Sequence, residues 1–188
     1  MLWTYPYRMY DYRMTEMPTT NPEKEKSIDD NDRKFTLGTI DPRFLDGHGA
    51  HSYVLVTDWL ETNEKDETKV ACKKFQDGKV ETLLITKTTV DGKRVAKKTE
   101  ISEEDYRKYL EHAKVHVEKI RHEFSFIQDG VPFAIKYDEF IDSELRVLEV
   151  GSAAPADTES FKPENFPFTL KEVSDDKSFV GFRVVAHI

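Results

Sequence analysis

Basic side chains are concentrated in one short part of this chain. Between Lys69 and Lys98 there are nine lysine or arginine residues and three acids, so this segment carries a charge of about +6. The whole chain has a formal charge of −8 at pH 7, and its remaining residues are therefore strongly acidic. Clustered cationic groups attract anions by direct charge interaction. The segment predicts an inward or concave face that binds a small polyanion.

The elements that must position these side chains are predicted from turn signals. Asp77-Gly78 and Asp91-Gly92 interrupt the segment 69–102. Asp-Gly is typical of two-residue hairpin turns, because type I′ geometry needs a positive φ at both central residues. The segment is therefore predicted to form three consecutive antiparallel strands.

The rest of the chain is also rich in strand signals. Ser102 followed by Glu103 and Glu104 is typical of a helix start, and apolar residues then recur at helical spacing, so an amphipathic helix is predicted over 103–117. Asp129-Gly130 predicts another hairpin. Further strands are expected at 28–40, 52–61, 119–127, 131–140 and 145–152, with loops at 41–51 and 152–167. About eight strands and one main helix indicate an α+β chain built on an antiparallel barrel or a strongly curved sheet.

Two regions differ in composition. Residues 1–27 are expected to form an aromatic N-terminal arm followed by a polar linker, and residues 28–188 a single domain. The arm is too aromatic for ordinary disorder. Two interpretations stay open: residues 1–14 dock on a protein partner or a second copy of the chain, or they cover an apolar patch of their own domain.

Composition also excludes several classes of function. No apolar run approaches the roughly 20 residues that a membrane-spanning helix needs, and no signal peptide is visible, so we expect a cytoplasmic or intracellular protein without membrane contact. The single cysteine, Cys72, excludes an internal disulfide and a cysteine-based metal cluster. A pI near 5.3 argues against binding to long nucleic acids.

A series of short motifs follows in a familiar order. They are Asp30–Phe35 in the place of an E-x-E-x-K strand, Lys69–Lys73 before Gln76-Asp77-Gly78, Ile85-Thr86-Lys87, Arg94–Ser102, Lys119-Ile120-Arg121, Leu148–Gly151 and Glu172–Asp176. Together they span about 160 residues. In this order they resemble the CYTH family, also called triphosphate tunnel metalloenzymes, which includes class IV adenylate cyclases, thiamine triphosphatases and inorganic triphosphatases.

The resemblance implies an eight-stranded antiparallel β-barrel, or tunnel, with one main helix. Inward basic side chains are then expected to hold a triphosphate or a nucleotide, and carboxylates to hold Mg²⁺ or Mn²⁺, because phosphoryl transfer needs cations around the phosphate oxygens. The implied phosphate-binding residues are Lys34, Lys69, Lys73, Lys87, Arg94, Lys119 and Arg121. The implied metal ligands are Asp30, Asp32 and Glu149.

The chain departs from the family pattern mainly at acidic positions. Ala96 and Lys98 stand where the family usually has two acids, Lys136 follows in a strand that usually carries acids, and Gly151 takes the place of the second acid after Glu149. Added lysines make a divalent-metal site less favourable. We therefore expect a tunnel domain that binds a triphosphate or other small polyanion, with metal-dependent hydrolysis weak or lost, as in a pseudoenzyme. The alternatives are an inactive structural or assembly protein docked through its N-terminal arm, and an active divalent-metal-dependent triphosphatase.

Overall fold

Antiparallel strands make up most of the chain in the computed structural model, which describes residues 32–62, 66–90, 93–152, 158–179 and 183–185. The expected N-terminal arm, Asp30 and the Asp91-Gly92 turn lie outside these residues. The strands are β1 (Arg33–Thr36), β2 (His51–Thr62), β3 (Asp66–Phe75), β4 (Val80–Val90), β5 (Lys93–Glu100), β6 (Val115–Gln128), β7 (Val131–Phe140), β8 (Arg146–Gly151) and β9 (Lys171–Glu172). Two α-helices, α1 (Pro42–Gly47) and α2 (Glu103–Leu110), and two 3-10 turns, at Pro163–Asn165 and Lys177–Phe179, complete the described elements.

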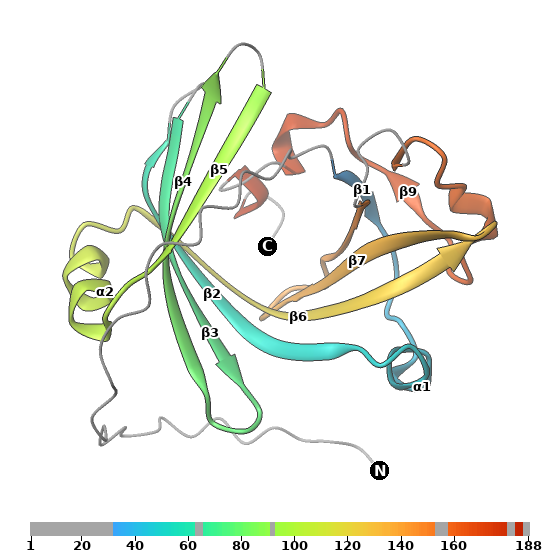
Figure 1. Ribbon diagram of the computed structural model, residues 1–188, viewed down its shortest axis with the longest axis horizontal. Coiled ribbons are helices and arrows are strands. Elements are labelled where there is room, and N and C mark those ends of the chain that lie inside the picture. The colour runs from blue at the N-terminus through green and yellow to red at the C-terminus, as the bar shows by residue number, and fades with distance from the viewer. Residues whose placement is uncertain (1–31, 63–65, 91–92, 153–157, 180–182, 186–188) are drawn as a thin grey trace.

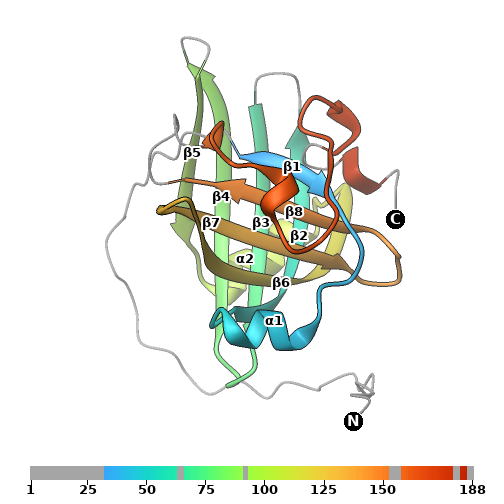
Figure 2. The same cartoon turned by 90° about the vertical axis from the view of Figure 1, so that its right-hand side faces the viewer.

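All nine strands belong to one sheet in the order β5-β4-β3-β2-β6-β7-β8-β1-β9. The sheet curves so strongly that β2–β5 and β6–β8 face each other (Figures 1 and 2). The expected eight-stranded closed barrel is wrong in two respects, since there are nine strands and the sheet is open. Among the described residues, β9 pairs only with β1 over two positions and does not reach β5, so nothing joins the two edges. The alternative expectation of a strongly curved antiparallel sheet is the one that holds.

Two of the three predicted hairpin turns lie within the described residues, and one of these two has the predicted two-residue geometry. Asp129 and Gly130 have φ of 52° and 82°, which is the two-residue geometry predicted between β6 and β7. At the β3–β4 turn only Gly78 has a positive φ, of 88°, and the backbone N–H of Phe75 donates to the carbonyl of Lys79. That turn therefore has three residues between Phe75 and Lys79, because Gln76 joins the loop.

The predicted main helix is too long by seven residues. Ser102 caps α2 by accepting from the backbone N–H of Asp105, as predicted, but the helix ends at Leu110. Strand β6 begins at Val115, and the N–H of Lys114 donates to the carbonyl of Trp59 at 2.8 Å. The β-branched Val115 and Val117 favour a strand, and cross-strand pairing with β2 overrides the helical spacing.

Helix α1 lies where a loop was expected. Asp41 caps its first turn by accepting from the N–H of Arg43, and Pro42 supplies a fixed φ at the first helical position. None of the described helices is long and apolar enough to cross a membrane.

The main hydrophobic core lies on the convex face of the β1–β6–β7–β8 half of the sheet. Phe133, Ile135 and Tyr137 point to this face from alternate positions of β7 and are almost completely buried. Helix α1 and the segment 158–170 cover them, and Phe161 and Phe166 from that segment are buried in the same cluster. This arrangement leaves the opposite, concave face of the same strands to polar residues.

Phe161 is predicted to be a principal stability determinant. Its side chain is 2% exposed, and its ring lies 5.2 Å from that of Phe133 and 5.7 Å from that of Phe35. Phe161→Ala should lower the free energy of unfolding by about 3–5 kcal/mol, measured by urea denaturation. Ile127→Ala, at a side chain that is 69% exposed, is the matched control and should change it by less than about 0.5 kcal/mol. Equal effects of the two substitutions would show that segment 158–170 is not part of the core.

Candidate anion-binding cavity

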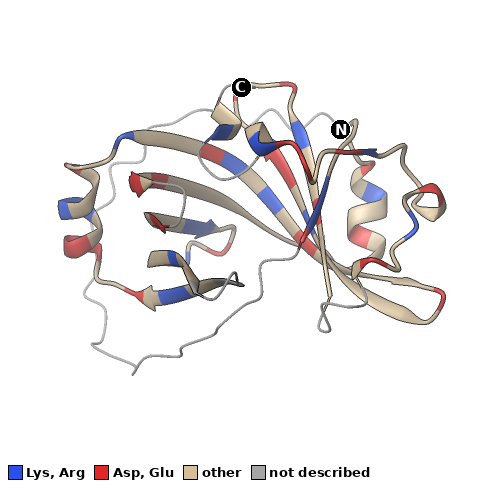
Figure 3. Cartoon of the chain, turned by 90° about the horizontal axis from the view of Figure 1, so that it is seen from above, with Lys and Arg blue, Asp and Glu red and all other residues tan. Residues whose placement is uncertain are grey.

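A cavity of about 390 Å³ lies on the concave face of the sheet. Strands β1 to β8 contribute side chains, at alternate positions where a strand contributes more than one, as the two-residue period of a strand dictates. Eight lysine or arginine residues and five carboxylates are among the described residues that line it. The basic ones are Lys34, Lys69, Lys73, Lys87, Lys98, Lys119, Arg121 and Lys136; the acidic ones are Asp32, Glu67, Glu123, Asp138 and Glu149. Blue basic and red acidic bands follow one another along neighbouring strands in Figure 3.

Most residues predicted to bind phosphate or metal come together in this cavity. Six of the seven predicted basic residues line it, as do two of the three predicted metal ligands, Asp32 and Glu149. Asp30 lies outside the described residues. Arg94 belongs to β5, but its side chain is outside the described part of the structure. The structure thus brings the predicted residues together, and their roles as phosphate or metal ligands stay predictions.

Asp138 is the most buried charged group in the cavity wall, with 1% of its surface exposed. Its carboxylate accepts from Arg121 Nε at 2.7 Å and Nη2 at 2.6 Å, and from Lys119 Nζ at 2.5 Å. Burial alone would raise the pKa of Asp138, but Arg121 and Lys119 hold that pKa below its usual value. Sequence reasoning missed Asp138, although it follows Lys136 at the spacing that puts both on one face of a strand.

Glu149 is the centre of a second charged group, where β1, β7 and β8 meet. Its carboxylate lies 3.6 Å from Lys136 Nζ, 3.5 Å from Arg121 Nη2 and 4.0 Å from Lys34 Nζ. Burial opposes ionisation, yet Arg121, Lys136 and Lys34 lower the pKa of Glu149 well below its usual value. Lys136 also donates to Asp32 Oδ2 at 2.5 Å. Glu149 is therefore ionised at neutral pH, and the carboxylates of Glu149 and Asp32 already face cations.

The opposite wall, formed by β3, β4 and β5, has cations that are less well neutralised. Lys69 pairs with Glu67 at 2.7 Å, but Lys73 is 3.7 Å from Glu81. Within the described part of the chain, no carboxylate lies within ion-pair distance of Lys98. Partial burial and then the neighbouring charges of Lys136, Lys73, Lys87 and Arg121 lower the pKa of Lys98. The place of Lys98 in the cavity wall was missed because the sequence analysis treated it only as a lost acid.

Burial lowers the pKa of some basic residues in the cavity, whereas the pKa of another is raised by neighbouring carboxylates. Burial and the nearby Arg121 lower the pKa of Lys119 to about 8, despite its pairing with Asp138. Burial also lowers the pKa of Lys69. The pKa of Arg121 is raised above its usual value, because Asp138 and Glu149 outweigh the effect of burial. At neutral pH the cavity therefore has an excess of positive charge that falls in mildly alkaline solution.

The described carboxylates do not fit the predicted Mg²⁺ or Mn²⁺ site. In the parts of the chain that the structure describes, no three His, Cys, Asp or Glu residues are grouped as metal ligands would be. Asp32 and Glu149, the two predicted ligands within those parts, both contact Lys136. A divalent ion with oxygen ligands needs several carboxylate or carbonyl oxygens directed at one point. Lys136 lies where those oxygens converge.

One end of the cavity is apolar. Trp59, Val117, Phe140, Val147 and Val184 form a buried cluster there, and each of them also lines the cavity. Trp59 Nε1 is buried without a hydrogen-bond partner in the described structure. Val184, near the C-terminus, supplies part of this cluster.

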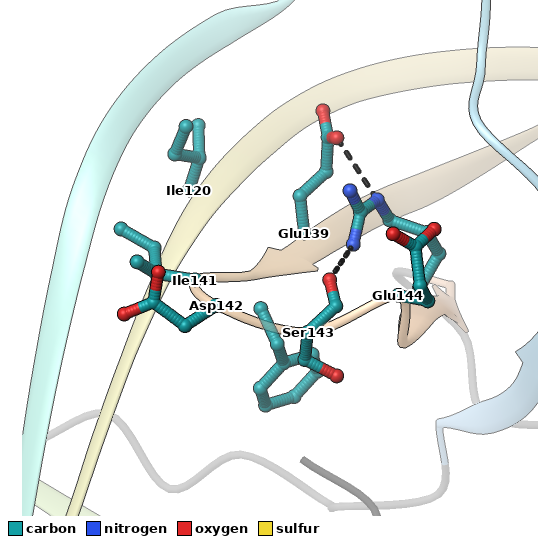
Figure 4. Close-up of a pocket in the computed structure, with 8 residues that line it drawn as sticks. Ile120, Glu139, Ile141, Asp142, Ser143 and Glu144 are labelled. Atoms are coloured by element: carbon teal, nitrogen blue, oxygen red, sulfur yellow. Dashed lines mark hydrogen bonds and ion pairs between the residues drawn. The ribbon is translucent and has the colours of Figure 1, made fainter. Parts of the chain in front are cut away.

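A second hollow, of about 420 Å³, lies at the β7–β8 turn (Figure 4). Its one basic lining residue, Arg146, pairs with Glu139 at 3.0 Å and donates to the carbonyl of Ser143 at 2.8 Å. The arginine is therefore occupied in holding the turn. We regard the concave cavity, and not this hollow, as the candidate site.

Comparison with known proteins supports the fold. No family model matches the chain, and no curated protein matches its sequence. Among solved structures, the inorganic triphosphatase NE1496 is 21% identical with a TM-score of 0.56, over 89% of this chain and 99% of that one. A second structure of NE1496 gives 22% identity and a TM-score of 0.54, over 85% and 97% of the two chains. A Hippeastrum protein, HpAC1, described as a putative adenylyl cyclase with a dominant triphosphatase activity, is 12% identical with a TM-score of 0.50, over 79% and 93%. At these identities the likeness concerns the fold, and the chain has the CYTH-like fold of these triphosphatases.

Proposed function

We propose that the concave cavity binds a triphosphate or another small polyanion, and that metal-dependent hydrolysis is weak or lost. The observation that carries this proposal is the excess of cations in an enclosed space, eight basic residues against five carboxylates. The fold shared with triphosphatases supports the same class of ligand.

The physical argument concerns charge repulsion. Two unit charges 4 Å apart interact by about 4 kcal/mol at the effective dielectric constant of a protein surface. Burial and then the charges of four other cations lower the pKa of Lys98, and among the described residues no carboxylate lies within ion-pair distance of it. A polyanion in the cavity would turn this repulsion into attraction, and its phosphate oxygens would accept from several ammonium groups at once. The cavity is therefore best suited to a ligand with several phosphate groups.

The two alternatives differ in what they require. An active triphosphatase needs carboxylates free to hold a metal, whereas Asp32 and Glu149 pair with Lys136. A structural role requires the N-terminal arm to dock on a partner, and the arm lies outside the described residues. The open volume of the cavity favours a binding site over a purely structural domain.

Tripolyphosphate is expected to bind without added metal and to raise the melting temperature as its concentration increases. Lys98→Ala should weaken binding by about 10- to 100-fold, because it removes a charged hydrogen-bond donor. Isothermal titration calorimetry measures the affinity. Lys97→Ala, at the neighbouring position on the other face of β5, is the matched control and should leave the affinity unchanged. Absence of tripolyphosphate binding, or equal effects of both substitutions, would contradict a site on the concave face.

Binding is expected to weaken as the pH rises above about 8. The anion prefers protonated Lys119, whose pKa is about 8 in the free protein, so binding above that pH must take up a proton. Affinity should then fall by up to about tenfold per pH unit for each proton taken up. Calorimetry at pH 7, 8 and 9 in buffers of different ionisation enthalpy measures both effects. Lys119→Arg keeps its charge and should flatten the profile; a wild-type affinity that rises with pH would argue against this role of Lys119.

Hydrolysis is expected to be slow. Phosphate release from tripolyphosphate, ATP and thiamine triphosphate, with Mg²⁺ or Mn²⁺, should stay close to the rate without protein. The reason is that Lys136 and Arg121 occupy the carboxylates on which a metal would depend. Turnover that Glu149→Gln abolishes would instead establish the active triphosphatase, and the proposed loss of hydrolysis would be wrong.

A further inference from the structure

Lys136 contacts two carboxylates that could otherwise bind a metal cation. Its ammonium group lies 2.5 Å from Asp32 Oδ2 and 3.6 Å from Glu149 Oε2. Lys136 and Glu149 are direct cross-strand partners on β7 and β8, and Asp32 immediately precedes β1. Three parts of the chain thus meet at one nitrogen atom.

Gly151 makes this meeting possible. A Cβ atom at position 151 would lie 2.5 Å from Asp32 Oδ1, which is closer than real Cβ contacts allow. The Asp32 carboxylate therefore occupies the space that a side chain at 151 would fill. Glu149 and Gly151 share one face of β8, so Asp32 and Glu149 present two carboxylates side by side. Two adjacent carboxylates repel each other unless a cation lies between them.

We propose that Lys136 is a built-in cation that takes the place of a divalent metal between Asp32 and Glu149, so that the cavity takes the metal-free form of a polyphosphate and not its metal chelate. The claim about the ligand rests on the proposed function. The claim about Lys136 rests on its contacts alone.

The remaining cations complete the argument. Lys34 and Arg121 also lie within 4.0 Å of Glu149, so each of its two carboxylate oxygens has a cation within 4.0 Å. An incoming metal ion would have to displace tethered ammonium groups and meet their charge. On the opposite wall, Lys98 has no such carboxylate within the described structure and is available to an anion. Free polyphosphate keeps its full negative charge because no metal is bound to it. It would therefore be attracted most strongly to the cations of that wall.

The first test needs no variant and no phosphate. Mn²⁺ is titrated into the wild-type protein and followed by calorimetry and by melting temperature. We expect no saturable binding and no stabilisation. Saturable binding of Mn²⁺ to the wild-type protein that Glu149→Gln abolishes would overturn the proposal, because it would mean that the carboxylates are open to a metal despite Lys136.

The second test reverses the charge at the site. Lys136→Glu places a third carboxylate beside Asp32 and Glu149, and we expect the Mn²⁺ affinity to increase by at least about tenfold over that of the wild type. Lys74→Glu makes the same charge change on β3, at the exposed position next to Lys73, and should gain no Mn²⁺ binding. Equal affinities of the two folded variants would overturn the proposal. If Lys136→Glu does not fold, the wild-type titrations decide.

The third test compares tripolyphosphate binding to the wild-type protein in EDTA and in excess Mg²⁺. We expect binding in EDTA that is as tight as, or tighter than, binding in Mg²⁺. Binding that needs Mg²⁺ would overturn the inference and leave the proposed function intact. No binding under either condition would overturn the proposed function, while the Mn²⁺ titrations would still decide the role of Lys136.

Discussion

The interior of this curved sheet depends on the pairing of Asp138 with Lys119 and Arg121. A buried charge without a partner destabilises a protein by several kcal/mol, whereas a buried pair with good geometry is tolerated. Arg121 meets both carboxylate oxygens of Asp138, and Lys119 meets one of them. This pairing allows β6 and β7 to carry charges into the concave cavity, while Tyr137, the preceding residue of β7, packs in the apolar core on the other face.

Much of the strand pattern could be predicted from the sequence, because local signals determine it. Asp129-Gly130 encodes a tight turn whatever surrounds it, and its positive φ angles follow. The two largest errors, in the length of the main helix and in the closure of the sheet, occurred where distant partners decide. The predicted helix extended through Val117 because the apolar residues of this segment are compatible with the spacing of a helix and with that of a strand. Only the pairing with β2 selects the strand. Whether the sheet closes depends on the stagger and twist of all strands together, and no local signal in the sequence contains that information.

The sequence predicts which site residues of one strand share a face, but it does not predict which residues of different strands become neighbours. Lys119 and Arg121, two residues apart, must share a face, and this spacing was enough to place them together. Which residues of another strand lie opposite depends on register. Glu149 faces Lys136 and Lys34 only because of the pairing of β8 with β7 and β1. Lys136 and Lys98 were interpreted as losses from an acidic set, since their place in the cavity wall becomes visible only when their neighbours are known.

The apolar end of the cavity strengthens the charges at the other end. Trp59 and Phe140 exclude water from their surroundings, and Lys69 and Lys119 lie over their rings at 5.0 and 5.2 Å. Less water means a lower effective dielectric constant, so each charge acts more strongly on its neighbours. The same desolvation lowers the pKa of Lys119, while Arg121, two residues further along β6, keeps its charge because Asp138 and Glu149 outweigh burial. The charge of the cavity is therefore set by where each basic residue lies along its strand, and not by how many basic residues the chain contains.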